Sequence, residues 1–347
     1  MTVKKIFRIG FAFFMVSLII IYTSECAQAV SDGLRLCGTK VIPSLFPMFV
    51  ASKLVVGILK NASLPRVFLR LWHRIFGVGG QCAYGFLFGL LGGYPLGASV
   101  ISELYENKAI SKTEAEKSLR FCNNSGPGFF LAALGTAVFQ DLKTGIILYG
   151  IHIFSAILLG ILSAGTPRGE DHFEPQSFVE KPFSSLFMDA IQDSCASLLK
   201  ICGLILFFAV IIALLNAIGL FRIMANLPLI QPETETIALL HGIIELTGGV
   251  FALQNTENAF IISAFLMGWG GLCVHFQAAS LWKKAGLKPK GYYASKLLQA
   301  VISAGLAWAF QAADPRLVGF ICIILILFLS ILRFSRKYTG NPDRYAL

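Results

Sequence analysis

Polar side chains able to bind an anion lie in the segment FCNNSGPGFF (121–130) of this otherwise apolar, 347-residue chain. Asn123, Asn124 and Ser125 supply uncharged donors and acceptors. Pro127 has no N–H and disfavours helical geometry at the residue before it, so a helix beginning beyond it would present unpaired N–H groups. Such a helix start binds anions. A turn at the membrane surface accounts for the same residues equally well, so both interpretations stay open.

A carboxyl group, Glu245, lies within the apolar segment HGIIELTGG (241–249). An ionisable side chain is energetically unfavourable at membrane depth and is a functional-site candidate, here as a proton or cation site or as a substrate contact. His241 precedes it by four residues, which is the spacing at which two helical side chains meet. Because no H-E-x-x-H motif is present, the pair does not indicate an intramembrane metalloprotease.

Two further segments, GLLGGYPLGA (89–98) and GWGGLCVHFQ (268–277), combine helix breakers with polar side chains. Tyr94 offers a ring and a hydroxyl in the first, and His275 and Gln277 follow a glycine pair in the second. Non-helical backbone at membrane depth is tolerated only against protein or a water-filled cavity. Helix packing through small residues is the alternative for the first segment. The predicted hinge residues of all the breaks are Gly92, Gly93, Gly97, Gly126, Pro127, Gly128, Gly248, Gly249, Gly270 and Gly271.

No catalytic motif accompanies these residues, since the chain has no G-x-S-x-G turn, phosphate-binding loop or dinucleotide fingerprint. The sequence therefore predicts no enzyme, no catalytic residue, no metal site and no cofactor, and it leaves open a coupling ion, either Na⁺ or H⁺. The eight cysteines include no C-x-x-C pair and lie mostly in apolar stretches, where they act as small apolar residues.

The composition is that of a polytopic membrane protein. Charged residues make up 14% of the chain, against about 25% in soluble domains, and 56% of the residues are hydrophobic. The net charge of +10 does not indicate nucleic acid as a partner, because the basic residues cluster in short loops between apolar runs. By the positive-inside rule, both termini and the 283–290 loop lie in the cytoplasm.

Apolar runs long enough to cross a lipid bilayer predict an all-α fold with about 8–10 transmembrane or re-entrant helices. The candidate spans are 9–26, 41–59, 82–102, 145–164, 201–220, 237–253, 259–279, 294–310 and 317–332. Between two of them, 102–120 is predicted to be one amphipathic helix with a capping box at Ser111 and Glu114. The first span is similar to a cleavable signal peptide, but its length favours retention as a membrane anchor.

The chain divides into two similar halves around a polar linker with three prolines. The predicted parts are an N-terminal anchor with an amphipathic segment (1–40), a first repeat (41–166), the linker (167–185), a second repeat (186–313), and a C-terminal helix with a basic tail (314–347). Each repeat holds a broken glycine-rich segment, a second polar interruption and an apolar span. Paired breaks of this kind indicate a transporter built from inverted repeats, with its binding site near the bilayer midplane.

The order of these motifs resembles that of the sporulation integral membrane proteins of the YlbJ type, in the Gate, or nucleoside-recognition, domain superfamily. The matching motifs are GYPLGA, ISKTEAE, FCNNSGP, ELTGG and GGLCVHFQ, with DGLRLCGTKVIPSLFPMFV (32–50) upstream. The resemblance covers residues 30–310 and implies an architecture similar to that of concentrative nucleoside transporters. One departure is Gly248, which stands where the family often has asparagine.

The resemblance implies a carrier that moves dipicolinic acid from the mother cell towards the forespore by alternating access, and that is required for spore cortex formation. It implies the bacterial cell membrane or the outer forespore membrane as the location, with the lipid bilayer and the small anion as partners. The implied substrate contacts are Tyr94, Pro95, Asn123, Asn124, Ser125, Glu245, Thr247, His275 and Gln277. A homo-oligomer is an open alternative to a monomer.

An ionised Glu245 would repel such a dianion, so we expect this carboxyl to be protonated or paired with a cation, and to be a coupling site. Two other functions stay open. One is a carrier of nucleosides or other small metabolites, and the other is a non-transporting assembly factor for the spore envelope. An assembly factor needs no broken helices at membrane depth, which favours a carrier.

Overall fold

The computed structural model describes residues 3–60, 64–163, 182–220, 223, 233–313, 318, 319 and 324, and within these ranges its regular elements are helices, without a strand. The all-α fold of a polytopic membrane protein is therefore confirmed, and the relation of the halves by inverted symmetry stays a prediction. The helices are α1 (Val3–Ile21), α2 (Thr23–Leu36), η1 (Cys37–Val41), α3 (Ile42–Lys60), α4 (Arg66–Phe76), α5 (Cys82–Gly92), α6 (Leu96–Glu106), α7 (Lys112–Cys122), η2 (Gly128–Val138), α8 (Leu142–Ser163), α9 (Phe183–Ala217), α11 (Glu233–Ile244), α12 (Leu246–Ala252), α13 (Ala259–Trp269), α14 (Gly271–Lys284) and α15 (Tyr292–Ala312).

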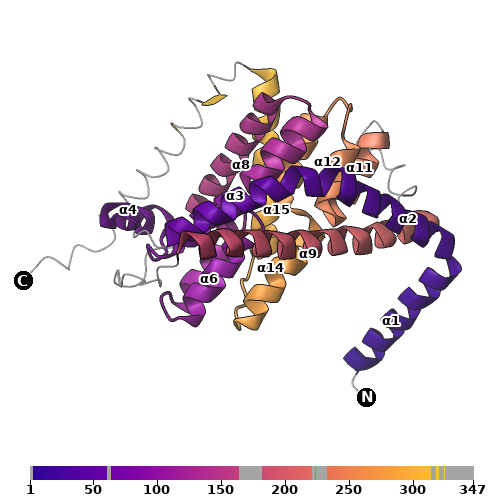
Figure 1. The fold of residues 1–347 in the computed structure, drawn as a ribbon, viewed down its shortest axis with the longest axis horizontal. Coiled ribbons are helices and arrows are strands. Elements are labelled where there is room, and N and C mark those ends of the chain that lie inside the picture. Colours follow the sequence, from indigo (N-terminus) through magenta and orange to yellow (C-terminus); the bar gives the residue numbers. More distant parts are fainter. Residues whose placement is uncertain are drawn as a thin grey trace, which may run out of the picture.

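Within the described part of the chain, four helical stretches are long and apolar enough to cross a membrane: Thr23–Ile58, Leu142–Ser163, Phe183–Ala217 and Ala259–Lys284. The first joins α2, η1 and α3, and both α2 and α3 pack against α9, which lies across the molecule in Figure 1. Only 22% of the most apolar window of the first and of the third stretch is buried. Their other apolar side chains are thus left for contact with lipid.

Glycine and proline divide the predicted spans where the sequence places its breaks. The 82–102 span is two helices, because α5 ends at Gly92 and α6 begins at Leu96. The 259–279 span is divided at Gly270, whose φ of 90° lies in the left-handed region that glycine adopts without strain. The predicted first span, 9–26, is also divided, at Tyr22 and without a glycine or proline, and α1 extends away from the body of the molecule (Figure 1).

The single amphipathic helix predicted over 102–120 is wrong. Helix α6 ends at Glu106, and Lys108 then adopts a φ of 58°, which is incompatible with a continuing right-handed helix. The predicted capping box is confirmed, but it opens a new helix, α7. The Ser111 hydroxyl accepts from the Glu114 backbone N–H at 3.3 Å, and a Glu114 carboxylate oxygen accepts from the Ser111 N–H at 2.8 Å.

Helix α8 begins beside a carboxylate that accepts hydrogen bonds from its first turn. Asp141 accepts from the Thr144 hydroxyl at 2.7 Å, from the Thr144 N–H at 3.0 Å and from the Lys143 N–H at 3.1 Å. These bonds, that of the Thr144 hydroxyl above all, hold the pKa of the exposed Asp141 carboxyl below its usual value. The contacts fix the turn that connects η2 to α8.

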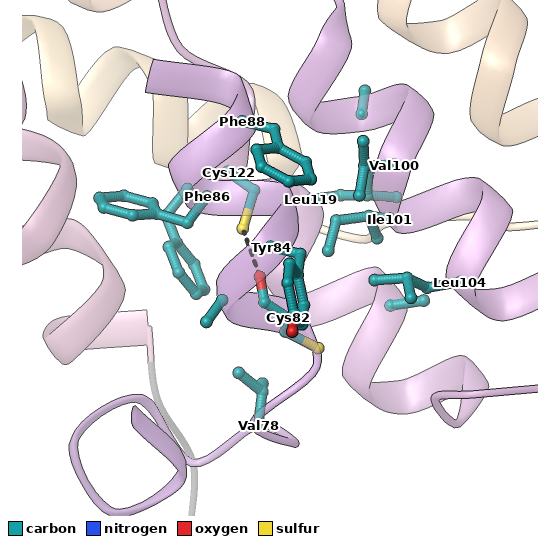
Figure 2. Close-up of a cluster of buried hydrophobic side chains, with 14 of the residues drawn as sticks. Val78, Cys82, Tyr84, Phe86, Phe88, Val100, Ile101, Leu104, Leu119 and Cys122 are labelled. Carbon is teal, nitrogen blue, oxygen red and sulfur yellow. Dashed lines mark hydrogen bonds between the residues drawn. The ribbon is translucent and has the colours of Figure 1, made fainter. Parts of the chain in front are cut away.

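Apolar side chains of α5, α6 and α7 form a core beneath the first break. Figure 2 shows Phe86 and Phe88 of α5 with Ile101 of α6 and Leu119 of α7. In the same cluster the Cys122 thiol donates a long, 4.0 Å bond to the backbone oxygen of Cys82. Of the cysteines that the structure describes, those at 26, 37, 82, 122 and 273 are buried and none is in a disulfide. The linker at 167–185 and the span at 317–332 lie largely outside the described residues.

Candidate functional site

The two breaks of the first half meet backbone to backbone. Gly93, with a φ of 76°, contacts Gly126, where an added Cβ would lie 2.8 Å from the Gly93 nitrogen. An added Cβ at Gly89 or at Gly97 would overlap the backbone oxygen of Cys122. The segment GLLGGYPLGA is therefore both a helix break and a site of close packing through small residues. Its glycines let the backbone at the end of α7 lie directly on α5 and α6.

The segment FCNNSGPGFF is not a turn at the surface of the protein. Asn123 and Asn124 are wholly buried and Ser125 is 2% exposed. The Ser125 N–H donates to Nε2 of His152 on α8 at 3.2 Å, and η2 begins at Gly128. The break thus lies inside the protein. The expected exposure of N–H groups beyond it to a substrate stays a prediction.

The breaks of the second half also pack against each other. An added Cβ at Gly249 would overlap the backbone of Gly242, so α12 folds back closely on α11. Gly271, with a φ of 76°, begins α14, and its Cβ would lie 3.0 Å from the Leu246 nitrogen. These glycines bring the α11–α12 break and the α13–α14 break into contact.

Glu245 caps helix α12. Its φ of −131° places it outside the helix, and its two carboxylate oxygens accept the N–H groups of Thr247 at 2.9 Å and Gly248 at 2.6 Å. The side chain is 4% exposed. Both oxygens thus face the N–H groups at the positive end of the helix. These backbone donors could not be read from hydropathy, and the expected protonation or cation pairing of Glu245 stays a prediction.

Five of the nine predicted substrate contacts line one cavity: Tyr94, Ser125, Glu245, Thr247 and Gln277. They come from both halves of the chain and from all four breaks. The rest of the described wall consists of Gly93 and Gly126 and the mainly apolar residues Leu45, Phe49, Phe129, Ile201, Leu204, Leu246, Cys273 and Val274. The cavity is therefore an apolar chamber with a few convergent polar groups, which is the usual character of a small-molecule site.

The cavity is narrow in this conformation. Its volume is about 50 Å³, against roughly 300 Å³ at the small end of ligand pockets. Tyr94 lies at the contact between the halves, since its hydroxyl donates to the backbone oxygen of Met267 at 3.0 Å, in the last turn of α13. A ligand of more than a few atoms requires the wall to open.

The other four predicted contacts do not line the cavity. Pro95 precedes α6, and Asn123, Asn124 and His275 belong to a buried polar network behind the break. In that network Tyr292 Oη accepts from Asn123 Nδ2 at 3.1 Å and lies 3.3 Å from His275 Nδ1. These residues support the wall of the cavity.

Two members of this network, Lys296 and Gln299 of α15, were not among the predicted contacts. The Lys296 ammonium donates to the backbone oxygen of Asn123 and, at 2.8 Å, to the Gln299 side-chain oxygen. Gln299 Nε2 in turn donates to Asn124 Oδ1 at 3.2 Å. The available signal was a lysine inside the predicted span 294–310, which marks a functional-site candidate as the carboxyl group in HGIIELTGG does.

No group of three histidine, cysteine or acidic side chains that could hold a metal ion occurs in the part of the chain that the structure describes. Glu245 supplies a carboxyl group at the cavity, and Lys296 supplies an amino group behind it. The site is thus suited to binding through hydrogen bonds, ring contacts and charge.

The chain is similar to the sporulation integral membrane protein YlbJ of Bacillus subtilis (strain 168), with 28% identity over 328 residues, covering 85% of this chain and 80% of that protein. This similarity supports the YlbJ-type assignment and a membrane protein of sporulation. No protein-family model matches the chain. No solved structure matches it.

Proposed function

We propose, with the YlbJ-type assignment as the premise, that this protein is a carrier that moves dipicolinic acid across the membrane towards the forespore. The observation that carries the proposal is the single cavity at which broken helices of both halves converge. Unpaired backbone at membrane depth needs a protein or water environment, and a site between two repeats is the position that transporters use. An assembly factor has no comparable need for such a cavity.

The groups at the cavity fit the chemistry of the proposed substrate. Dipicolinate is a flat pyridine ring with two carboxylates. The Ser125 and Thr247 hydroxyls and the Gln277 amide can donate to carboxylate oxygens, and the Tyr94 ring offers a face for the pyridine. The Glu245 charge is offset by the two N–H groups that it accepts, which lessens its repulsion of an anion.

Transport in this proposal is by alternating access in an elevator-like carrier of the Gate superfamily. The narrow cavity is one state, and substrate enters and leaves when the halves separate. Coupling is to Na⁺ or H⁺, with no organic cofactor. The protein resides in the cell membrane or the outer forespore membrane, with both termini in the cytoplasm.

Uptake into proteoliposomes tests the proposal. Purified protein is reconstituted, and the uptake of labelled dipicolinate and of labelled nucleosides is measured side by side, with protein-free vesicles as the control. We expect saturable dipicolinate uptake and no nucleoside uptake. Saturable nucleoside uptake without any response to dipicolinate would reverse the assignment.

A nucleoside carrier is the second candidate, and the uncharged hydroxyl and amide groups of the cavity favour it. A deletion strain separates the two functions in cells. Loss of a dipicolinate carrier leaves dipicolinate made by the mother cell but absent from the spores. Normal loading of the spores in that strain would exclude the first proposal.

A further inference from the structure

Lys296 is wholly buried, yet no carboxylate pairs with it among the residues that the structure describes. Its two acceptors, the backbone oxygen of Asn123 and the side-chain oxygen of Gln299, are both neutral. A buried ammonium without an anionic partner is unfavourable, and an anion that comes near relieves that penalty. When it is protonated, this amino group is a cation in the protein interior without a paired anion.

The side chains around Lys296 do not supply the missing negative charge. The network contains His152 of α8, His275 of α14 and Tyr292 of α15, none of which carries a carboxylate. Three of its buried polar atoms have no hydrogen-bond partner: Asn123 Oδ1, His152 Nδ1 and His275 Nε2. Buried polar groups are normally satisfied, so this network is not saturated by the protein itself.

The ammonium lies directly behind the cavity wall. It bonds to Asn123, two residues before Ser125, which lines the cavity. Two residues span at most about 7 Å, so the charge lies on the order of 10 Å from a bound molecule. The acidic group of the wall, Glu245, accepts from two backbone N–H groups at the start of α12, and Lys296 donates to two neutral oxygens.

We propose that Lys296 sets the charge selectivity of the cavity, so that a dianion binds in preference to a monoanion or a neutral molecule. This proposal deepens the proposed function and rests on it. Lys296 acts across the Asn123–Ser125 break through its electric field. Its charge therefore acts on the substrate in proportion to the charge that the substrate carries.

The test compares two pyridine acids that differ by one carboxylate. Dissociation constants of pyridine-2,6-dicarboxylate and pyridine-2-carboxylate are measured with purified protein in lipid nanodiscs, for the wild type and for Lys296→Met. Removal of one unit charge at about 10 Å weakens binding on the order of tenfold per unit of ligand charge. We expect roughly a tenfold loss for the monoanion and roughly a hundredfold loss for the dianion.

Gln299 gives a second variant that keeps the lysine in place. Gln299→Glu sets a carboxylate at the position now 2.8 Å from the ammonium, and neutralises its field at constant size. We expect the same charge-graded loss. Gln299→Leu removes the side-chain hydrogen bonds of Gln299 without adding charge. It should weaken the binding of both acids by one common factor. Lys143→Met removes an exposed lysine and should change neither constant.

If binding of the two acids is weakened equally in Lys296→Met and Gln299→Glu, or is not weakened, the inference is overturned and the proposed function still stands. If the wild type binds neither acid, the proposed function fails and the charge selectivity fails with it. If Lys296→Met does not fold, the comparison of Gln299→Glu with Gln299→Leu decides alone.

Discussion

Glu245 is both a helix cap and a residue of the cavity wall. As a cap it accepts the first N–H groups of α12, and as a wall residue it borders the cavity with Thr247. Glu235 provides an internal comparison, because it is buried too and accepts from the Asn258 N–H at 2.7 Å and from Asn258 Nδ2 at 2.9 Å, at the start of α13. Only Glu245 is placed to affect a substrate directly.

The variants Glu245→Gln and Glu235→Gln should separate these tasks. Each replaces an acceptor oxygen by an amide group, and we expect each to lower the free energy of unfolding by about 1 kcal/mol. Uptake of dipicolinate should be lost in Glu245→Gln alone. Thermal unfolding and proteoliposome uptake measure the two effects. Normal uptake in Glu245→Gln, or an equal loss in both variants, would show that the carboxylate serves only the helix.

The sequence pointed to the right segments but not to every residue in them. Tyr94 and Gln277 could be found because polar groups beside glycine breaks in apolar runs stand out. Asn123 and Asn124 belong to the same motif, yet α15 covers them. Lys296 itself stood out as a lysine inside a predicted span, but its contact with the Asn123 oxygen, 173 residues away, cannot be read from local spacing.

At the scale of elements, the breaks were predictable and their contacts were not. Glycine marks where α5 and α13 end, since it interrupts helical geometry. Helix α11 instead ends before Glu245, and the predicted hinge residues Gly248 and Gly249 lie inside α12. The helix start at Lys112 was obscured because α6 and α7 carry polar residues on both sides of a short turn. Which glycine faces which backbone oxygen depends on tertiary packing. The structure shows this for Gly97 and Cys122.

Gly97→Ala should destabilise the protein strongly. The new methyl group would overlap the Cys122 backbone oxygen, so the chain after α7 would have to shift away from α6, at about 3 kcal/mol of the free energy of unfolding. Gly150→Ala is the matched control in α8, because nothing lies within 4 Å of its added Cβ. The control should be neutral or more stable by up to about 1 kcal/mol. Thermal unfolding in detergent compares them, and equal melting temperatures would refute the contact.

At the scale of the whole molecule, α15 separates two ends of the protein. At its start, the Lys288 N–H donates to a Glu116 carboxylate oxygen at 2.9 Å, which joins the 283–290 loop to α7. At its far end, Phe310 lines a second hollow with Thr256 and Glu257. A helix of 21 residues is about 31 Å long, close to the thickness of the hydrocarbon core.

Labelling from the two sides of the membrane should therefore give opposite results at Lys284→Cys and Glu257→Cys, both at exposed positions. We expect a membrane-impermeant maleimide to reach Lys284→Cys from the cytoplasmic side and Glu257→Cys from the opposite side, because basic loops stay in the cytoplasm. Cys195, the exposed thiol of the described residues, is first removed by Cys195→Ser, and this parent protein is labelled as the background control. Labelling of both positions from one side would refute this topology.

The hydrogen bond from Tyr94 to Met267 joins the first half of the chain to the second at the narrow cavity. If the halves must part for substrate to pass, this bond has to break on the way, so it adds to the activation barrier of opening. A neutral hydrogen bond of about 1 kcal/mol corresponds to roughly a fivefold change in rate. Tyr94→Phe should accelerate exchange of dipicolinate across proteoliposomes by that factor.

Tyr149→Phe is the matched comparison, because the Tyr149 hydroxyl donates to the backbone oxygen of Leu90 at 2.9 Å, within the first half alone. That bond is not broken when the halves part, so its loss should leave the exchange rate unchanged. Equal acceleration in both variants would place the moving boundary elsewhere. Acceleration in Tyr94→Phe alone would mean that one tyrosine hydroxyl sets, in part, the opening rate of the carrier.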